Sequence, residues 1–347
     1  MCLAFVSGHM GQPWSASAEG WGSVEHMMVD AIVVGGGPAG LSAATWLARY
    51  RRSVLVLDSG EYRNRWAEAA HGYLGRDPVH PAELLKQARD DLCAYPTAEV
   101  RHQRAVKVNA DGAGRFEVLT ETGRLLGRRL VLASGVRDEL PEIGGFFDHY
   151  GASVFHCPSC DGYEAKGRQV VAIGWSEQVV GFALELLGWA AEVTVVTDGH
   201  RFAGDGGHRR ILEDRGVLVR EEAALELVGA RGALRALRLE GGDRIACQLA
   251  FFSIAHHPVT GLGEQLGCER DEGGYLVVDS EGATSVPGVF AAGDVTPGLQ
   301  LVQVAAGSGA VAGIGCAMSL ENDPRTPPPL PPDVEDQVQV KGTSTRG

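Results

Sequence analysis

The chain has 347 residues, which is long for one hydrophobic core and predicts two domains. Its formal net charge of -13 argues against a nucleic-acid partner, because phosphate binding needs a basic surface. Its apolar stretches are shorter than the ~18 residues of a membrane-spanning helix, so we expect no membrane partner.

The two ends of the chain differ in composition from the rest. Residues 1–27 lack the basic and then apolar layout of a signal peptide, and we expect a disordered extension there. The proline-rich, polar residues 322–347 are expected to be disordered as well. Without an export signal we expect a cytoplasmic protein, in which isolated cysteines stay reduced. The cysteines expected to be free thiols are Cys2, Cys93, Cys247, Cys268 and Cys316.

A glycine-rich motif follows the first predicted strand. Residues 30–40 read DAIVVGGGPAG, and the strand Ala31 to Val34 runs into this turn and then into a helix. A second predicted strand follows the helix and ends at Asp58. The order of strand, G-x-G-x-x-G turn, helix, strand and acid is typical of a dinucleotide-binding fold.

Each position of this turn has a physical task. Gly35 permits the tight turn, Gly37 lets the backbone approach a pyrophosphate, and Gly40 lets helix and strand pack closely. The helix N-terminus supplies amide donors for the phosphates, and the acid after the second strand can accept bonds from a ribose diol. The expected contacts to the dinucleotide are therefore Gly35, Gly37, Pro38, Ala39, Gly40 and Asp58.

A second motif lies near the end of the chain. Residues 284–295 read TSVPGVFAAGDV, a predicted strand followed by Gly293 and Asp294, and a small-residue helix comes next. This arrangement resembles the second FAD-binding segment of flavoproteins with two dinucleotide folds. The resemblance implies that Asp294 holds the ribityl chain and that the helix near Gln303 points its N-terminus at the flavin. It implies FAD contacts at Asn64, His71, Gly135, Gly293, Asp294, Gln303 and Val304.

The segment between the two motifs repeats the strand–turn–helix–strand pattern over residues 169–197. The predicted fold is therefore α/β, with two Rossmann-like, three-layer dinucleotide-binding domains. The FAD-binding domain is expected to be discontinuous, over residues 28–145 and 262–321. The inserted NAD(P)-type domain is expected over residues 146–261.

Residues 156–161 read HCPSCD, and a C-x-x-C pair can bind zinc, form a structural bridge or shuttle electrons. Zinc needs two further ligands, and no second C-x-x-C exists in the sequence. A structural bridge over so short a loop constrains the unfolded chain little. A redox pair fits best, because such a turn often lowers one thiol pKa.

The position of this pair, just before the inserted domain's first strand, resembles low-molecular-weight thioredoxin reductases and their C-x-x-C-D pattern. The resemblance implies that Cys160 faces the flavin, Cys157 exchanges with the substrate and Asp161 is the acid/base. Asp161 could also serve as an N-cap. His256 and His257, in the second domain crossing, are candidates to deprotonate an incoming thiol, or else hinge residues.

The inserted domain departs from the NADPH-binding pattern. At its turn Ser176 stands where close approach needs a glycine, and Glu177 puts negative charge at a helix N-terminus. Asp198 follows the next strand, where relatives carry a basic clamp for the 2′-phosphate, although Arg201 could restore some positive charge. We therefore predict weak NADPH binding or none.

The favoured function is an FAD-dependent thiol/disulfide oxidoreductase that oxidises a small dithiol or a thioredoxin-like protein and passes electrons to oxygen. The alternatives are a thioredoxin reductase that uses NADPH, ferredoxin or a second flavin, and a redox-sensing flavoprotein. The family resemblance implies a homodimer formed by the FAD-binding domains.

Overall fold

The structure is a computed structural model and describes residues 28–112 and 114–323. The expected N-terminal extension and all but two residues of the expected tail lie outside the described residues. The described chain divides into two compact units. Unit 1 holds residues 28–62, 82–136 and 258–323, apart from residue 113, and unit 2 holds residues 63–81 and 137–257.

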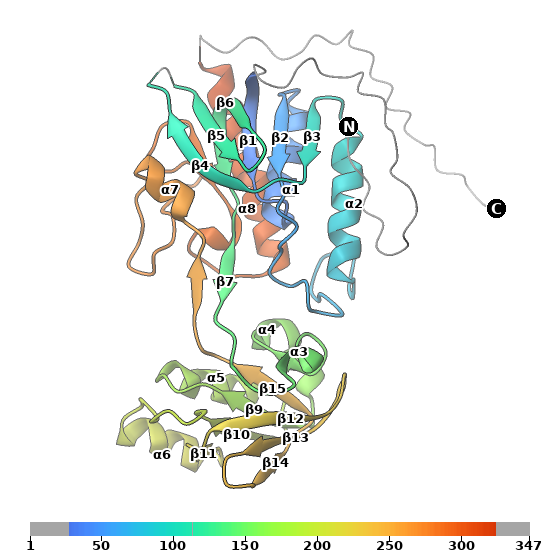
Figure 1. The fold of residues 1–347 in the computed structure, drawn as a ribbon, viewed down its shortest axis with the longest axis vertical. Helices are drawn as coiled ribbons and strands as arrows, with labels where there is room; N and C mark the ends of the chain where they lie inside the picture. Colours follow the sequence, from blue (N-terminus) through green and yellow to red (C-terminus); the bar gives the residue numbers. More distant parts are fainter. Residues whose placement is uncertain (1–27, 113, 324–347) are drawn as a thin grey trace, which may run out of the picture. The chain divides into compact units, whose positions relative to one another are not determined.

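Unit 1 is built on a seven-stranded sheet in the order β3-β2-β1-β6-β5-β4, with β17 paired to β6 (Figure 1). Strands β1, β2, β3, β6 and β17 are parallel, and β5 and β4 continue the sheet antiparallel. The strands are β1 Met28–Val34, β2 Val54–Leu57, β3 Ala98–Arg101, β4 Ala105–Ala110, β5 Phe116–Thr120, β6 Arg124–Leu132 and β17 Val289–Ala291. The helices are α1 Pro38–Arg49, α2 Pro81–Cys93, α7 Gly261–Leu266, the short η3 Gly293–Val295 and α8 Val302–Glu321.

Both faces of this sheet are buried. Successive side chains of β1 point to opposite faces, so Ala31 and Val33 join one core while Ile32 joins the other. The first core contains side chains of α1, α2 and α8. The second contains side chains of β4 and β5 and is covered by α7. Burial on both faces explains why these parallel strands read as continuous apolar runs.

Helix α8 lies against α1 because its glycines remove side chains from the contact. A Cβ added at Gly309 would lie 2.1 Å from the carbonyl oxygen of Ala39, and one at Gly313 would lie 2.5 Å from that of Ala43. By length and composition alone α8 is apolar enough to cross a membrane. Its packing on α1 accounts for that composition, since small apolar residues permit this close approach.

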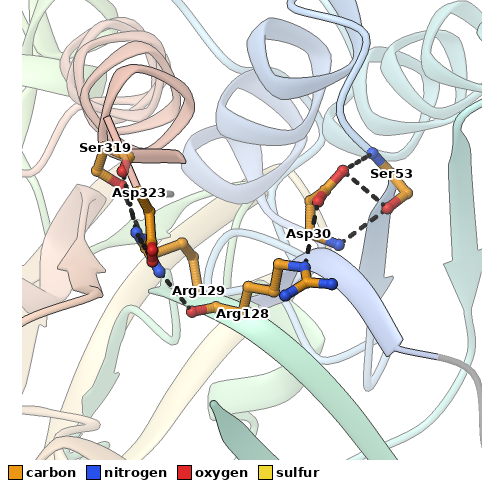
Figure 2. Close-up of polar contacts among 6 residues, drawn as sticks. All are labelled: Asp30, Ser53, Arg128, Arg129, Ser319 and Asp323. Carbon is orange, nitrogen blue, oxygen red and sulfur yellow. Dashed lines mark hydrogen bonds and ion pairs between the residues drawn. The ribbon is translucent and has the colours of Figure 1, made fainter. Parts of the chain in front are cut away.

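Two polar clusters fix the end of unit 1 opposite the glycine turn (Figure 2). The buried Arg129 donates from Nε to Ser319 Oγ (2.8 Å) and from Nη2 to the Ser319 carbonyl oxygen (2.9 Å), which caps the C-terminal turn of α8. Its Nη2 also pairs with Asp323 Oδ2 at 3.1 Å, so the ordered chain continues past residue 322, where the predicted tail begins. Asp30 accepts from the Ser53 amide at 2.9 Å, which ties β1 to the start of β2.

Unit 2 is built on a five-stranded parallel sheet in the order β11-β10-β9-β15-β8, and a three-stranded antiparallel sheet, β12-β13-β14, accompanies it. The strands are β8 Val154–Phe155, β9 Gln169–Ile173, β10 Glu192–Val196, β11 Leu218–Arg220, β12 Ala224–Ala230, β13 Ala233–Leu239, β14 Arg244–Ala246 and β15 Leu249–Phe252. The helices are α3 Phe146–His149, α4 Pro158–Asp161, η2 Gly162–Ala165, α5 Gln178–Leu186 and α6 Gly206–Asp214. The crossing strands β7 Val136–Asp138 and β16 His256–Pro258 pair with each other.

The second sheet is also covered on both faces. Val170 and Ala172 of β9 pack with α5 and α6, whereas Val171 packs on the side covered by β12 and β13. Together the two units confirm the predicted α/β class with two Rossmann-like sheets, each buried between layers.

The unit boundaries differ from the predicted domain boundaries in residues 63–81 and at the two crossings between the units. Residues 63–81 belong to unit 2, although they fall within the first part of the predicted FAD-binding domain. Backbone contacts explain this: the Glu68 amide donates to the Gly151 carbonyl (3.0 Å), and a Cβ at Gly151 would lie 2.0 Å from the Trp66 carbonyl oxygen. The chain crosses at 136–137 and 257–258 rather than at 145–146 and 261–262.

Candidate active site

The turn between β1 and α1 has the geometry of a pyrophosphate-binding loop. Gly35 has φ +117, and a Cβ there would lie 2.1 Å from the Ala133 carbonyl oxygen. A Cβ at Gly40 would lie 1.9 Å from the Gly35 carbonyl oxygen, so only glycine permits this packing. Gly37 precedes Pro38, the first residue of α1, and nothing lies within 4 Å of a Cβ built on it. Space therefore remains open in front of the first N–H groups of the helix, where a phosphate binds.

Asp58 lies beside this turn at the end of β2. A Cβ at Gly36 would come within 2.1 Å of the Asp58 Cγ, so the carboxylate takes the place of a side chain at the turn. Its Oδ1 accepts from the Gly60 amide (2.8 Å), and its Oδ2 accepts from Arg89 Nη1 (3.2 Å). The sequence motif does not reveal Arg89, because that residue comes from α2. An oriented carboxylate here suits a ribose diol.

The second FAD motif meets the first in unit 1. Gly293 has φ +76, and a Cβ there would lie 2.7 Å from the Ala39 Cβ in the first turn of α1. The Gly293 amide donates to Ser308 Oγ of α8 at 2.9 Å. Asp294 follows on η3, and Gln303 lies in the first turn of α8, next to Val304. Folding therefore brings together two motifs that lie far apart in the sequence.

The residues of unit 1 fit an FAD molecule. Gly37 leaves room for the pyrophosphate, and Asp58 offers an acceptor for the ribose. Gly135 has φ +69, with nothing within 4 Å of a Cβ built on it, so its backbone is also approachable. A bound FAD would supply two-electron redox chemistry. Asn64, another predicted contact, lies in unit 2, where its carbonyl accepts from the Ala67 amide.

The cysteine pair forms a turn before the first long strand of unit 2. Cys157 and Cys160 are joined by a disulfide, with their Cα atoms 5.2 Å apart. Cys157 is the N-cap of α4, and its Sγ accepts from the Cys160 amide at 3.1 Å. Trp189 packs against Gly162, two residues after Cys160, since a Cβ at Gly162 would lie 2.7 Å from the Trp189 ring.

Asp161 directly follows the pair and ends α4. Its pKa is raised to about 7, mainly by burial and also by the charge of Glu164, while His71 acts in the opposite direction. A carboxyl group with that pKa exchanges protons near neutral pH, as an acid/base for thiols requires. The structure shows Asp161 as the last residue of α4 and N-cap of η2, without a side-chain capping bond.

His71, predicted to contact the flavin, lies in unit 2 beside this turn. Its Nδ1 is 3.0 Å from Asp77 Oδ1, and its Nε2 is 3.6 Å from Glu164 Oε1. Neither acid belonged to the predicted site, because nothing in the motif marks residues 77 and 164 as neighbours.

A second titratable cluster lies near the crossing strands. Arg63 donates to Asp138 through Nε (2.9 Å) and Nη2 (2.6 Å). Burial alone would raise the pKa of Asp138, but the Arg63 bonds, with His156 and His256 nearby, hold it below its usual value. Burial also lowers the pKa of His156 to about 4, so its ring, 3.2 Å from the Tyr150 hydroxyl, is neutral at pH 7.

The two predicted histidines of the crossing have different surroundings. Burial, together with the charge of Arg63, lowers the pKa of His256, which leaves the ring available as a proton acceptor at neutral pH. His257 Nε2 lies 2.8 Å from Glu139 Oε1 on an exposed surface. His256 is therefore the better candidate for a base, and His257, which pairs with Glu139, is the better candidate for a hinge residue.

The remaining cysteines only partly match expectation. Cys247, Cys268 and Cys316 are free and buried, and burial raises the pKa of Cys247 and Cys316 to about 12. The expectation for Cys93 is wrong, because it is disulfide-bonded, and Cys2 lies outside the described residues. Within residues 28–112 and 114–323, no group of three or more His, Cys, Asp or Glu side chains is placed to hold a metal ion.

Comparison with known proteins agrees with this geometry. The chain matches the family model for pyridine nucleotide-disulphide oxidoreductases over residues 29–309. It is 34% identical to thioredoxin reductase tcpT of Claviceps purpurea (strain 20.1), with 82% of this chain and 92% of that protein covered. The crystal structure of HlmI has a TM-score of 0.81 and 36% identity, over 86% of this chain and 94% of that chain. A putative thioredoxin reductase, TrxB from Bacillus anthracis, has a TM-score of 0.79 and 29% identity, over 84% and 98% of the two chains. We conclude from the glycine turn, the paired cysteines and these similarities that the chain belongs to the pyridine nucleotide-disulphide oxidoreductases, in their low-molecular-weight, thioredoxin reductase-like group of FAD-dependent enzymes.

Proposed function

We propose that this oxidoreductase passes electrons between a dithiol, the Cys157–Cys160 pair and FAD without using NADPH, and that oxygen is the final acceptor. In this direction the substrate dithiol is oxidised to a disulfide, and the Cys157–Cys160 disulfide is reduced to two thiols. A bound FAD would supply the two-electron acceptor for the Cys157–Cys160 dithiol, and oxygen would take up the electrons as hydrogen peroxide. Relatives named thioredoxin reductases support a thioredoxin-like protein or a small dithiol as substrate.

The observation that carries this proposal is the altered nucleotide turn of unit 2. Gly174 is required for packing inside the unit, because a Cβ there would lie 2.6 Å from the Ser253 carbonyl oxygen. The next residue, Trp175, stacks on His200, with ring centroids 3.9 Å apart and an interplanar angle of 16°. Ser176 then adds a side chain where a pyrophosphate needs close contact with the backbone.

Two carboxylates lie at the places that should attract phosphates. Glu177 is the N-cap of α5, and its exposed side chain is negative beside the helix N-terminus. Asp198 follows β10 with φ +52, and its Oδ1 accepts from the Ala224 amide at 2.8 Å, which holds the charge in place. Each lost charge-assisted phosphate contact costs about 1.5–3 kcal/mol, so two losses weaken binding by about a hundredfold or more.

We expect NADPH to reduce the bound flavin slowly, whereas a small dithiol reduces it quickly. The measurement is stopped-flow absorbance of the flavin under nitrogen, with each reductant in turn, followed by readmission of oxygen. Continued oxygen uptake with excess dithiol would separate an enzyme from a sensor that is reduced only once. Reduction by NADPH at tens per second with micromolar half-saturation would instead establish an ordinary thioredoxin reductase, with Arg201 as the residue that supplies positive charge.

One observation favours a second candidate, a thioredoxin reductase that takes electrons through a second flavin. The Ser176 hydroxyl is buried without a hydrogen-bond partner among the described residues, and a bound ligand would supply one. The neighbouring Trp175 ring suits an isoalloxazine better than a charged pyrophosphate. Electrons from a ferredoxin-like protein would then reduce a disulfide substrate. Two flavins per chain in the purified protein, in place of one, would support this candidate.

Assembly and location remain predictions. The family resemblance supports a homodimer through the FAD-binding domains, which sedimentation velocity would test at micromolar concentration. We also propose a cytoplasmic location, which cell fractionation would test.

A further inference from the structure

A chain of three ionisable side chains leads to the cysteine turn inside unit 2. His71 lies between two acids, with its Nδ1 3.0 Å from Asp77 Oδ1 and its Nε2 3.6 Å from Glu164 Oε1. The Asp77 carboxylate can only accept, so Nδ1 carries the hydrogen in this contact and Nε2 is left facing Glu164. The Glu164 carboxylate that His71 Nε2 faces belongs to η2 and follows Asp161 by three residues.

Glu164 is an unusual member of this chain. Its Oε1 faces His71, while its Oε2 is buried and has no hydrogen-bond partner among the described residues. The Glu164 side chain as a whole is 34% exposed, so water screens its charge in part, and the buried Oε2 is the atom that interacts most strongly with nearby charge. Changes in the charge of His71 or Glu164 are therefore transmitted to the neighbouring carboxyl group of Asp161.

The groups that face Asp161 act on it in opposite directions. Glu164, from η2, repels a second negative charge, and His71, from residues 63–81, stabilises it. The Tyr150 hydroxyl, before β8, is held neutral because burial raises its pKa above the usual value. From α5, Glu185 accepts from Ser159 of α4 at 3.4 Å, and Trp189 covers Gly162 without adding charge.

We propose that His71, oriented by Asp77, is a positioning residue that sets the protonation of Asp161 through Glu164, and so sets the pH at which the Cys157–Cys160 disulfide exchanges with a dithiol. This inference rests on the proposed acid/base role of Asp161. In the exchange, the Asp161 carboxylate takes the proton of the attacking substrate thiol. A bond then forms between the substrate sulfur and Cys157, and the Cys157–Cys160 bond breaks with its electron pair left on Cys160 as a thiolate. Because His71 lowers the pKa of Asp161, it favours the carboxylate form and keeps exchange active at lower pH.

The signs of the expected shifts follow from charge. His71→Gln removes a group that favours the charged carboxylate, so the Asp161 midpoint should rise by roughly half a pH unit. Glu164→Gln removes a like charge, so the midpoint should fall by roughly the same amount. Asp77→Asn removes the acid that orients the His71 ring, so it should shift the midpoint in the same direction as His71→Gln, but less.

The test measures exchange directly, without flavin turnover. The FAD-loaded protein is mixed with excess dithiothreitol under nitrogen between pH 5 and 9, quenched with an alkylating agent, and the modified Cys157 is quantified by mass spectrometry. Dividing each rate profile by that of the Asp161→Asn variant removes the titration of the dithiol itself. The matched control is His208→Gln, which disrupts a histidine–aspartate pair of the same 3.0 Å length at the start of α6. That control should leave the profile unchanged.

The possible outcomes separate the inference from the proposed function. Midpoint shifts of opposite sign for His71→Gln and Glu164→Gln support the inference, because a loss of packing would not shift the two midpoints in opposite directions. Unchanged midpoints, or shifts of the same sign, overturn it while leaving the dithiol oxidase proposal intact. If Asp161→Asn has the rate profile of the unaltered protein, the acid/base role fails and the inference fails with it. If His71→Gln does not fold, the midpoints of Asp77→Asn and Glu164→Gln are compared instead. A rise for Asp77→Asn with a fall for Glu164→Gln supports the inference, and any other result overturns it.

Discussion

Replacing Cys160 by serine is expected to lower steady-state dithiol oxidation by at least about a thousandfold, because a hydroxyl cannot form the second half of the disulfide. A mixed disulfide between the substrate and Cys157 would then have no internal thiol to resolve it. Cys157→Ser should be equally inactive, since the thiol that exchanges with the substrate is lost. Oxygen uptake with excess dithiol measures both effects.

A cysteine outside the pair provides the control for this loss. Cys247→Ala removes a buried thiol whose pKa is raised to about 12 by burial, so it holds no thiolate at neutral pH. Its turnover should stay within about twofold of the unaltered protein. If Cys157→Ser and Cys160→Ser both keep more than about a tenth of the turnover, the pair is not the redox centre.

Gly309→Val is expected to give the largest loss of stability. Even a Cβ at this position would lie 2.1 Å from the Ala39 carbonyl oxygen, and valine adds two methyl groups beyond it. Helices α1 and α8 would have to separate, which we expect to lower the free energy of unfolding by at least about 3 kcal/mol. Because Ala39 belongs to the phosphate-binding turn, FAD retention should fall with it. Urea unfolding and the flavin absorbance of the purified protein measure the two effects.

The same helix supplies a glycine that should behave in the opposite way. Nothing lies within 4 Å of a Cβ built on the exposed Gly307, so Gly307→Ala adds helix propensity without a clash. It should raise the free energy of unfolding by about 0.5–1 kcal/mol. Equal destabilisation by Gly307→Ala and Gly309→Val would show that glycine flexibility, and not the approach of α1, is what α8 needs.

Local patterns account for the part of the site that the sequence predicts. The strand–turn–helix order around Gly35 and Gly40 depends on steric limits within a few residues, so the turn is recognisable before folding is known. The two sheets are also predictable, because strands buried on both faces read as apolar runs such as residues 54–57. The order of motifs then places the cysteine pair within the inserted unit.

The contacts that sequence reasoning missed join residues without a fixed spacing. Arg89 reaches Asp58 from a separate helix, and no turn geometry links the two positions. Residues 63–81 join unit 2 through backbone contacts to Gly151 and the Arg63–Asp138 pair, which tertiary packing alone determines. Tertiary packing also brings His71, a predicted flavin contact, beside Glu164, and no motif marks that pairing.

The packing of α1 against α8 has a consequence for synthesis on the ribosome. Helix α1 ends at Arg49 and its partner begins at Val302. Roughly 250 residues must therefore be translated in between, which takes about 12–50 seconds at typical elongation rates. Unit 2 ends at His257, so its whole sequence has been translated before α8 exists. At that point the glycine turn before α1 still lacks the helix that packs on it. During this interval the nascent chain exposes the small-residue surface of α1, and a ribosome that stalls before residue 302 releases a polypeptide that cannot complete its FAD-binding domain.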